Sequence, residues 1–194
     1  MARAVREFTS RKDSVFLTTY LPANNSLVAP GIFQYYYDPE NDMGGARDAL
    51  LAKGYTDVQI DELYGVMPEL QGLIESGAQV ATKNTADAFG PGSKLPEKLT
   101  AYFESTGAAS RSATKTFLFA GTETNSCVLA SVLGAINHYC RPVVIADEVS
   151  TANPNAGLAV FDYILPSFQN FVDTACTSEA LTVLSHGKVV QSSK

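Results

Sequence analysis

The sequence predicts an α/β fold of three layers, with helices on both faces of a doubly wound (Rossmann-like), mostly parallel sheet. Three observations predict it. Short apolar runs rich in β-branched and aromatic residues alternate with helical patterns along the chain. The length of 194 residues suits one compact domain, residues 1–194. A buried-strand pattern at residues 117–120 also passes through a glycine turn directly into a helix.

The remaining elements follow from composition and from Gly and Pro positions. We expect strands at residues 15–20, 79–82, 117–120 and 142–146, and a short one at 171–172. Expected helices cover residues 2–8, 45–53, 57–64, 96–105, 127–139 and 155–165, with Pro166 ending the last of these and Ser178 capping a final turn. Residues 68–75 form a turn or weak helix. Residues 21–45, which include three consecutive tyrosines, are predicted to form a long irregular loop.

The central stretch is the strand–turn–helix around Cys127. The apolar run FLFA at residues 117–120 is broken by Gly121, and Thr124 and Asn125 are good N-cap candidates for the helix that follows. Cys127 then lies in the first helical turn, at the carboxyl end of the strand. Backbone N–H groups and the helix dipole favour a thiolate there, and the same N–H groups could hold an oxyanion. The alternative role is that of a small buried hydrophobe, as for most lone cysteines.

Composition excludes several classes of function. A net charge of −6 leaves no basic footprint for nucleic acid, and no apolar run is long enough to span a bilayer. Three widely spaced cysteines form neither a disulfide framework nor a zinc cluster, and the start of the sequence does not look like a signal peptide. His138 and His186 lack metal-ligand spacing. We therefore expect a cytoplasmic protein with no metal and no cofactor.

Three segments carry a family resemblance. The run GTETNSCV (residues 121–128) resembles the Gly-x-x-Thr-Asp/Asn-x-Cys-Val signature of the isochorismatase-like cysteine hydrolases. KNTADAF (residues 83–89) is similar to the Lys-x-x-x-Ser-Ala-Phe segment of that family, with Asp87 in place of the serine. PVVIAD (residues 142–147) resembles the strand that follows the cysteine helix. The resemblance covers about residues 2–184, with an insertion at about residues 30–67.

The resemblance implies a catalytic set on this fold. Cys127 would be the nucleophile and Lys83 its cationic neighbour, whereas without the resemblance Lys83 would be an ordinary exposed lysine. A cis peptide bond between Thr122 and Glu123 would aim the N–H groups of Glu123 and Cys127 at one oxygen. Residues that would contact the substrate include Phe89 and Tyr20.

The sequence differs from the family pattern in one way that affects its predicted function. The family begins with a central strand that ends in a catalytic aspartate, whereas this sequence begins at the helix that follows it. The leading prediction is a hydrolase acting on the C–N bond of a small amide. We expect the activity of this chain to be weak or absent, because the family aspartate is not found, and we expect a compromised sheet, because the first strand is not found. The alternative is a catalytically impaired member with a binding or assembly role, and a redox-active thiol protein is a third reading. We also expect a homo-oligomer.

Overall fold

The structure, a computed structural model, describes residues 15–20, 50–63, 65–107 and 115–186. The expected helix at residues 2–8 and the tyrosine-rich loop lie outside the described residues. So does most of the expected insertion at residues 30–67, and residues 50–52 are the described helical part of the helix expected at 45–53. Within the described ranges, no helix has both the length and the apolarity that crossing a bilayer requires.

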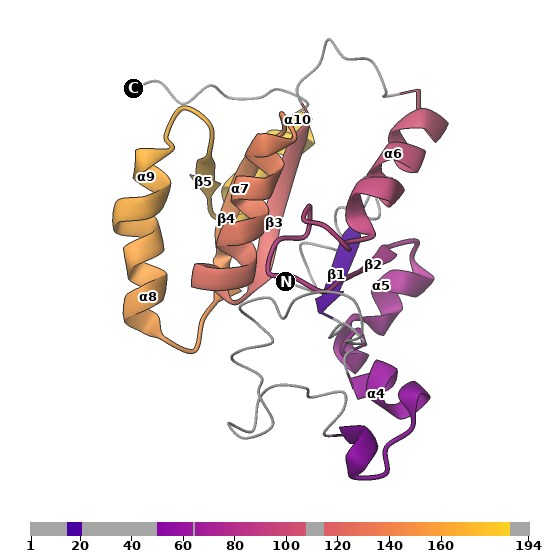
Figure 1. The fold of residues 1–194 in the computed structure, drawn as a ribbon. Helices are drawn as coiled ribbons and strands as arrows, with labels where there is room; N and C mark the ends of the chain where they lie inside the picture. Colours follow the sequence, from indigo (N-terminus) through magenta and orange to yellow (C-terminus); the bar gives the residue numbers. More distant parts are fainter. Residues whose placement is uncertain (1–14, 21–49, 64, 108–114, 187–194) are drawn as a thin grey trace.

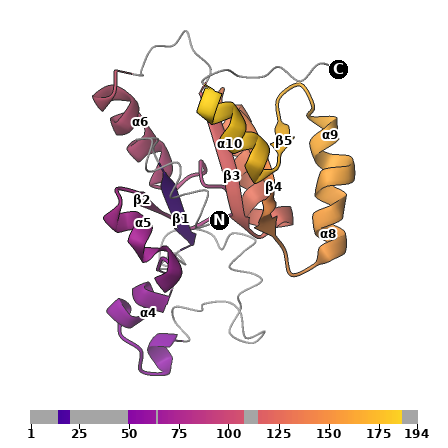
Figure 2. The same cartoon turned by 180° about the vertical axis from the view of Figure 1, so that it is seen from behind.

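The strands form two parallel sheets, which confirms the predicted α/β class. Strand β1 (Phe16–Tyr20) pairs in parallel with β2 (Gln79–Lys83). The second sheet has the order β3–β4–β5, built from Thr116–Thr122, Arg141–Ser150 and Asp173–Ala175. Strands β1 and β3 lie side by side in Figures 1 and 2, yet no strand pairing joins them among the described residues. Among the described residues, the parallel sheet that the sequence predicts is therefore divided between β1 and β3.

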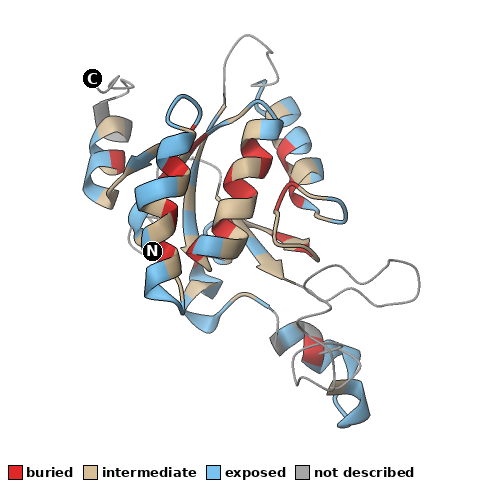
Figure 3. Ribbon diagram, turned by 60° about the vertical axis from the view of Figure 1, so that its left-hand side comes forward, coloured by how far each residue is buried: buried red, intermediate tan, exposed pale blue. Residues whose placement is uncertain are grey.

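Strand β3 is less buried than its composition predicts. Its residues alternate between exposed and half-buried, and Leu118 is 37% exposed (Figure 3). Phe117 and Phe119 pack into the core shared with β1, α6 (Leu95–Ser105) and α7 (Leu129–Asn137). An all-apolar run predicts cover on both faces, but Leu118 and Ala120, which share the second face of the strand, are exposed.

Helices lie on both sides of the three-stranded sheet. Helix α7 lies over one face, and α10 (Thr177–His186) lies over the other when the molecule is seen from behind (Figures 1 and 2). A valine-rich cluster joins α7 and β4 to the helical segment that follows β4. That segment consists of α8 (Pro154–Ala159), a π-helical turn η4 (Val160–Ile164) and α9 (Leu165–Ser167).

Pro166 does not end this helix, contrary to the prediction. It lies in the first turn of α9, where a missing N–H costs little. The preceding residue, Leu165, donates its N–H to Val160 O, five residues back. The π-helical turn thus places a new helix start in front of the proline, so the chain remains helical through Ser167.

The other boundaries differ by a few residues. Strand β4 continues to Ser150 because the pairing with β3 shifts between Phe119 and Gly121. Strand β5 covers residues 173–175 instead of 171–172. Helix α10 begins at Thr177, one residue before the expected Ser178 cap, and Glu179 Oε2 accepts the Cys176 N–H at 2.8 Å.

The region before β2 is a short helical arm. Helix α4 (Asp57–Leu63) begins with a capping box, in which Thr56 and Gln59 exchange backbone-to-side-chain hydrogen bonds of 2.9 and 3.3 Å. A 3-10 turn η2 (Pro68–Leu70) and helix α5 (Gln71–Glu75) follow, where the sequence predicted a turn or weak helix.

Candidate active site

Cys127 follows β3 through an unusual turn. The peptide bond between Thr122 and Glu123 is cis, and Gly121 has a φ of 130° that favours glycine. Cys127 then lies, half-buried, in a π-helical turn, η3 (Thr124–Val128), that continues directly into α7. The N-cap position belongs to Glu123, not to Thr124 or Asn125 as predicted, because Thr124 is already the first residue of the turn.

The π-helical turn changes which N–H groups are bonded. The carbonyl oxygen of Glu123 accepts the N–H of Ser126 at 3.2 Å and that of Val128 at 3.0 Å. An α-helix would instead direct the N–H of the residue four positions on, Cys127, to this oxygen. Glu123 O therefore bonds the N–H groups on either side of Cys127 and leaves that of Cys127 for another acceptor. Single π-helical turns of this kind are frequent at functional sites.

Lys83 is the last residue of β2 and is almost fully buried, with 4% of its surface exposed. Its Nζ donates to the carbonyl oxygens of Thr85 at 3.1 Å and Ala86 at 2.5 Å. Among the described residues, its hydrogen bonds go to these carbonyls and not to Cys127 Sγ. Burial rules out the ordinary exposed lysine that the sequence alone favoured, because an amine this deep must find acceptors.

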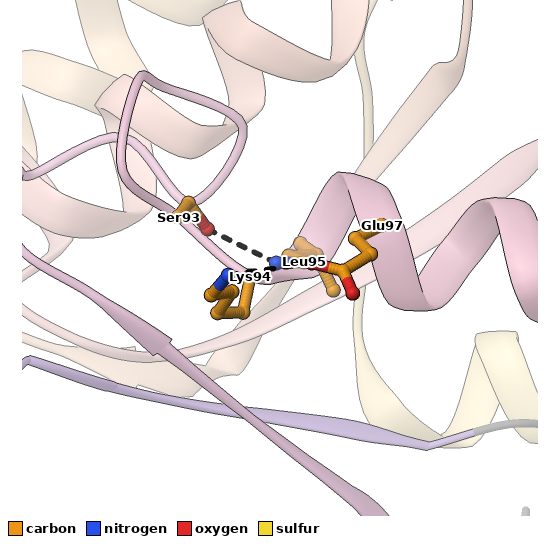
Figure 4. A network of polar contacts seen from close by, with 4 residues as sticks. All are labelled: Ser93, Lys94, Leu95 and Glu97. Carbon is orange, nitrogen blue, oxygen red and sulfur yellow. Dashed lines mark hydrogen bonds and ion pairs between the residues drawn. The ribbon is translucent and has the colours of Figure 1, made fainter.

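The loop after β2 returns to the sheet before α6 begins. Ser93 donates to the carbonyl oxygen of Ala88, and its hydroxyl accepts the N–H of Leu95, the first residue of α6, at 3.2 Å (Figure 4). The N–H of Lys94 donates to Thr82 O at 2.9 Å. Lys94 Nζ and Glu97 Oε2, 3.4 Å apart, form an exposed pair in the same turn. These contacts close the loop that carries the acceptors of Lys83.

The side chain of Glu123 crosses to the loop after β4. Its Oε2 accepts the hydroxyl of Thr151 at 2.6 Å and the N–H of Ala152 at 2.9 Å. Thr151 Oγ1 also lies 2.5 Å from Asn125 Oδ1, but one hydroxyl proton cannot serve two acceptors. The carboxylate is the stronger acceptor, so the amide of Asn125 is best oriented with its NH2 group toward Thr151.

These contacts affect the titration of Glu123. The Thr151 hydroxyl and the Ala152 N–H hold the pKa of this carboxyl below its ordinary value of 4.5. Partial burial works in the opposite direction, and a weak contact with the Thr122 hydroxyl adds to the lowering. Glu123 therefore stays ionised at neutral pH and links the turn before Cys127 to the loop after β4.

Glu123→Gln is expected to lower the melting temperature most at neutral pH, and progressively less as the pH falls below 4.5, the ordinary value for this carboxyl. A carboxyl whose pKa folding lowers stabilises the fold above its ordinary pKa. That contribution is lost as the pH falls through the lowered value. Thermal unfolding of both proteins between about pH 7 and pH 3 measures this. Glu104→Gln, at an exposed position, controls for the loss of a surface charge. A difference that does not vary with pH would contradict the expectation.

The two predicted substrate residues lie in different surroundings. Phe89 is 7% exposed and packs edge-to-face on Phe117 with ring centroids 6.0 Å apart. This burial favours a packing role for Phe89 over the predicted contact with substrate. Tyr20 is half-buried at the end of β1, directly opposite Lys83 in the register of the two strands. Its contact with substrate stays a prediction.

The described carboxylates near these elements have structural partners. Asp87 accepts the N–H of Phe89 at 2.8 Å, and its side chain lies against Gly134. Gly134 is seven residues beyond Cys127, about 10 Å along an ideal α-helix, so the Asp87 carboxylate packs about two turns further along the helix than the thiol. Asp147, which the resemblance compares with an acidic strand end, accepts the N–H of Thr177 at 2.7 Å and so anchors α10. Within the described ranges, no three His, Cys, Asp or Glu residues are grouped so that they could hold a metal ion.

Sequence reasoning missed two polar residues of this region. Ser131 donates to Cys127 O at 2.7 Å, and its position four residues after Cys127 is a spacing that could have indicated it. Thr151 had no such signal, because it reaches Glu123 across 28 residues of sequence.

Comparison with known proteins gives one family and several related folds. Residues 3–176 match the family described as Isochorismatase domain. No curated protein matches the sequence. Nicotinamidase from Bacillus subtilis is 18% identical over 90% of this chain and 81% of its own, with a TM-score of 0.60. N-carbamoylsarcosine amidase from Thermoplasma acidophilum is 14% identical over 91% and 79%, with a TM-score of 0.56. An isochorismatase family protein from Burkholderia thailandensis is 19% identical over 95% and 80%, with a TM-score of 0.55.

Proposed function

Because this chain belongs to the isochorismatase family, we propose that it is a hydrolase that cleaves the C–N bond of a small amide, with Cys127 as the nucleophile. The amide substrate class is supported by two proteins of similar fold, a nicotinamidase and an N-carbamoylsarcosine amidase. The three cysteines of the chain are free thiols, which suits a reducing compartment such as the cytoplasm. A homo-oligomer stays part of the proposal.

The observation that carries the proposal is the turn that holds Cys127. A thiol at the carboxyl end of a parallel strand, in the first turn of a helix, lies where open α/β sheets bind their ligands. Glu123 O bonds the N–H groups of Ser126 and Val128, so the N–H of Cys127 is directed elsewhere. In the proposal, this N–H and that of Glu123 stabilise the oxyanion.

The reaction proceeds through an acyl-enzyme. The sulfur of Cys127 attacks the amide carbon, a C–S bond forms, and the C–N bond breaks as the thiol proton passes to the leaving nitrogen. Water then adds to the thioester, releases the carboxylic acid and restores the thiol. Lys83 is buried at the end of β2, and its Nζ donates to Ala86 O. In the proposal, its positive charge favours the thiolate of Cys127.

Selective alkylation tests the proposal. We expect iodoacetamide to modify Cys127 at least about tenfold faster than Cys140 or Cys176, because thiolate character and access control the rate. Turnover of small amides, nicotinamide and N-carbamoylsarcosine among them, is expected to fall in parallel. Peptide mass spectrometry gives the three rates on one sample. Amide turnover that survives complete modification of Cys127 would reject the nucleophile.

A second candidate function is binding or assembly without catalysis. The observation that favours it is the absence of strand pairing between β1 and β3 among the described residues, since the sheet of β1 and β2 carries Lys83 whereas β3 leads to Cys127. Three alkylation rates within about threefold of one another, with no turnover of any amide tested, would favour this function.

A further inference from the structure

The hydroxyl of Ser131 joins the two halves of the proposed site. Ser131 lies in α7 and is 6% exposed. Its Oγ donates to Cys127 O at 2.7 Å and accepts the N–H of Ala88 at 3.0 Å, across 43 residues of sequence. One side chain thus bonds both the turn that carries the thiol and the loop that follows Lys83.

The same loop holds the acceptors of Lys83. Ala86 O, which accepts Lys83 Nζ at 2.5 Å, lies 3.4 Å from Ser131 Oγ. The single proton of the hydroxyl serves the shorter contact, Cys127 O, so Ala86 O is a neighbour of Ser131 and a partner of Lys83. Hydrogen bonds therefore connect the backbone of Cys127 through Ser131 to Ala88, two residues along the loop from the carbonyl oxygen that accepts Lys83.

A second contact holds the loop on the same face of the helix. Gly134 lies three residues after Ser131, and a Cβ built there would come within 2.2 Å of Asp87 Oδ1. Residues three apart share one face of a helix, so the loop docks at two successive points on α7. The docking is specific, because one point needs a hydroxyl and the other needs the absence of a side chain.

We propose that Ser131 is a positioning residue, which sets the placement of Cys127 relative to the loop that holds Lys83. The inference rests on the proposed function and adds a residue to it. The hydrogen bond to Cys127 O anchors the π-helical turn, and the hydrogen bond from Ala88 anchors the loop. Without the hydroxyl, Cys127 O and the Ala88 N–H lose their shared partner and the two elements can shift independently. Misplacement by about 1 Å can lower a rate roughly 100-fold.

Three variants test the role. Ser131→Ala is expected to lower kcat by about 10- to 100-fold with KM within about threefold, because the substrate contacts stay while the nucleophile is displaced. Ser131→Thr keeps the hydroxyl and is expected to restore kcat to within about fivefold. Ser167→Ala is the matched control: Ser167 makes the same kind of hydrogen bond to a carbonyl four residues back, Tyr163 O at 2.8 Å, but in α9. Its kcat is expected to equal that of the wild type.

The outcomes separate this inference from the proposed function. If Ser131→Ala lowers only the melting temperature, with kcat and the Cys127 alkylation rate unchanged, Ser131 is structural and the inference is wrong. If Cys127→Ala retains turnover, the proposed function itself fails. Should Ser131→Ala unfold at the assay temperature, Ser131→Cys keeps the shape of the side chain, slightly enlarged, with a weaker donor, and the same loss of kcat is expected.

Discussion

Cys127→Ala is expected to lower amide turnover by roughly 10³-fold or more, because removal of a covalent nucleophile closes the acyl-enzyme route. The melting temperature should change little, since Cys127 is only half-buried and Ser131 bonds its backbone, not its thiol. Steady-state turnover and thermal unfolding, measured on the same preparation, test both parts. A variant that loses activity together with its fold would not count as support.

Cys140→Ala is the matched control for this experiment. Cys140 is also half-buried, but burial raises the pKa of its thiol, with a smaller opposing effect from Lys115. At neutral pH this thiol is a poor nucleophile, so turnover of the variant should remain within about twofold of the wild type. Equal losses in the two variants would contradict a specific role for Cys127.

Gly134→Ala is expected to destabilise the protein by roughly 1–3 kcal/mol, although alanine is normally the better helix former. The new Cβ would fall 2.2 Å from Asp87 Oδ1, so the carboxylate must rotate away and give up the N–H of Phe89. A loss of this size corresponds to a melting temperature lower by roughly 2–12 °C for a chain of this length. Thermal or denaturant unfolding measures it.

Two further variants isolate the cause. Gly72→Ala, in α5, has no atom within 4 Å of the new Cβ and is expected to stabilise the protein by about 0.5–1 kcal/mol. Asp87→Ser shortens the side chain that Gly134 faces, so it is expected to recover much of the stability that Gly134→Ala loses. Additive effects in the double variant would show that the two positions do not interact.

Local pattern accounts for most of the elements and for the placement of Cys127. Strands β1 and β2 and helix α6 lie within one or two residues of their predicted bounds, because β-branched runs and Pro positions act over short distances. The spacing of FLFA, Gly121 and the following helical pattern likewise placed Cys127 at a strand end and in a first helical turn. The cis bond between Thr122 and Glu123 was expected only from the family resemblance.

Tertiary contacts decided the rest of the site. The hydrogen bond from Ala88 to Ser131 and that from Thr151 to Glu123 cross 43 and 28 residues, and no local period encodes such pairs. The alternation of exposure along β3, and the absence of pairing with β1 among the described residues, depend on which elements lie beside the strand and not on its own composition. The amino-acid sequence alone determined a thiol at the end of a parallel strand. Only the folded chain determined how Ser131 joins the backbone of Cys127 to the loop that follows the buried Lys83, because such contacts form where distant segments pack.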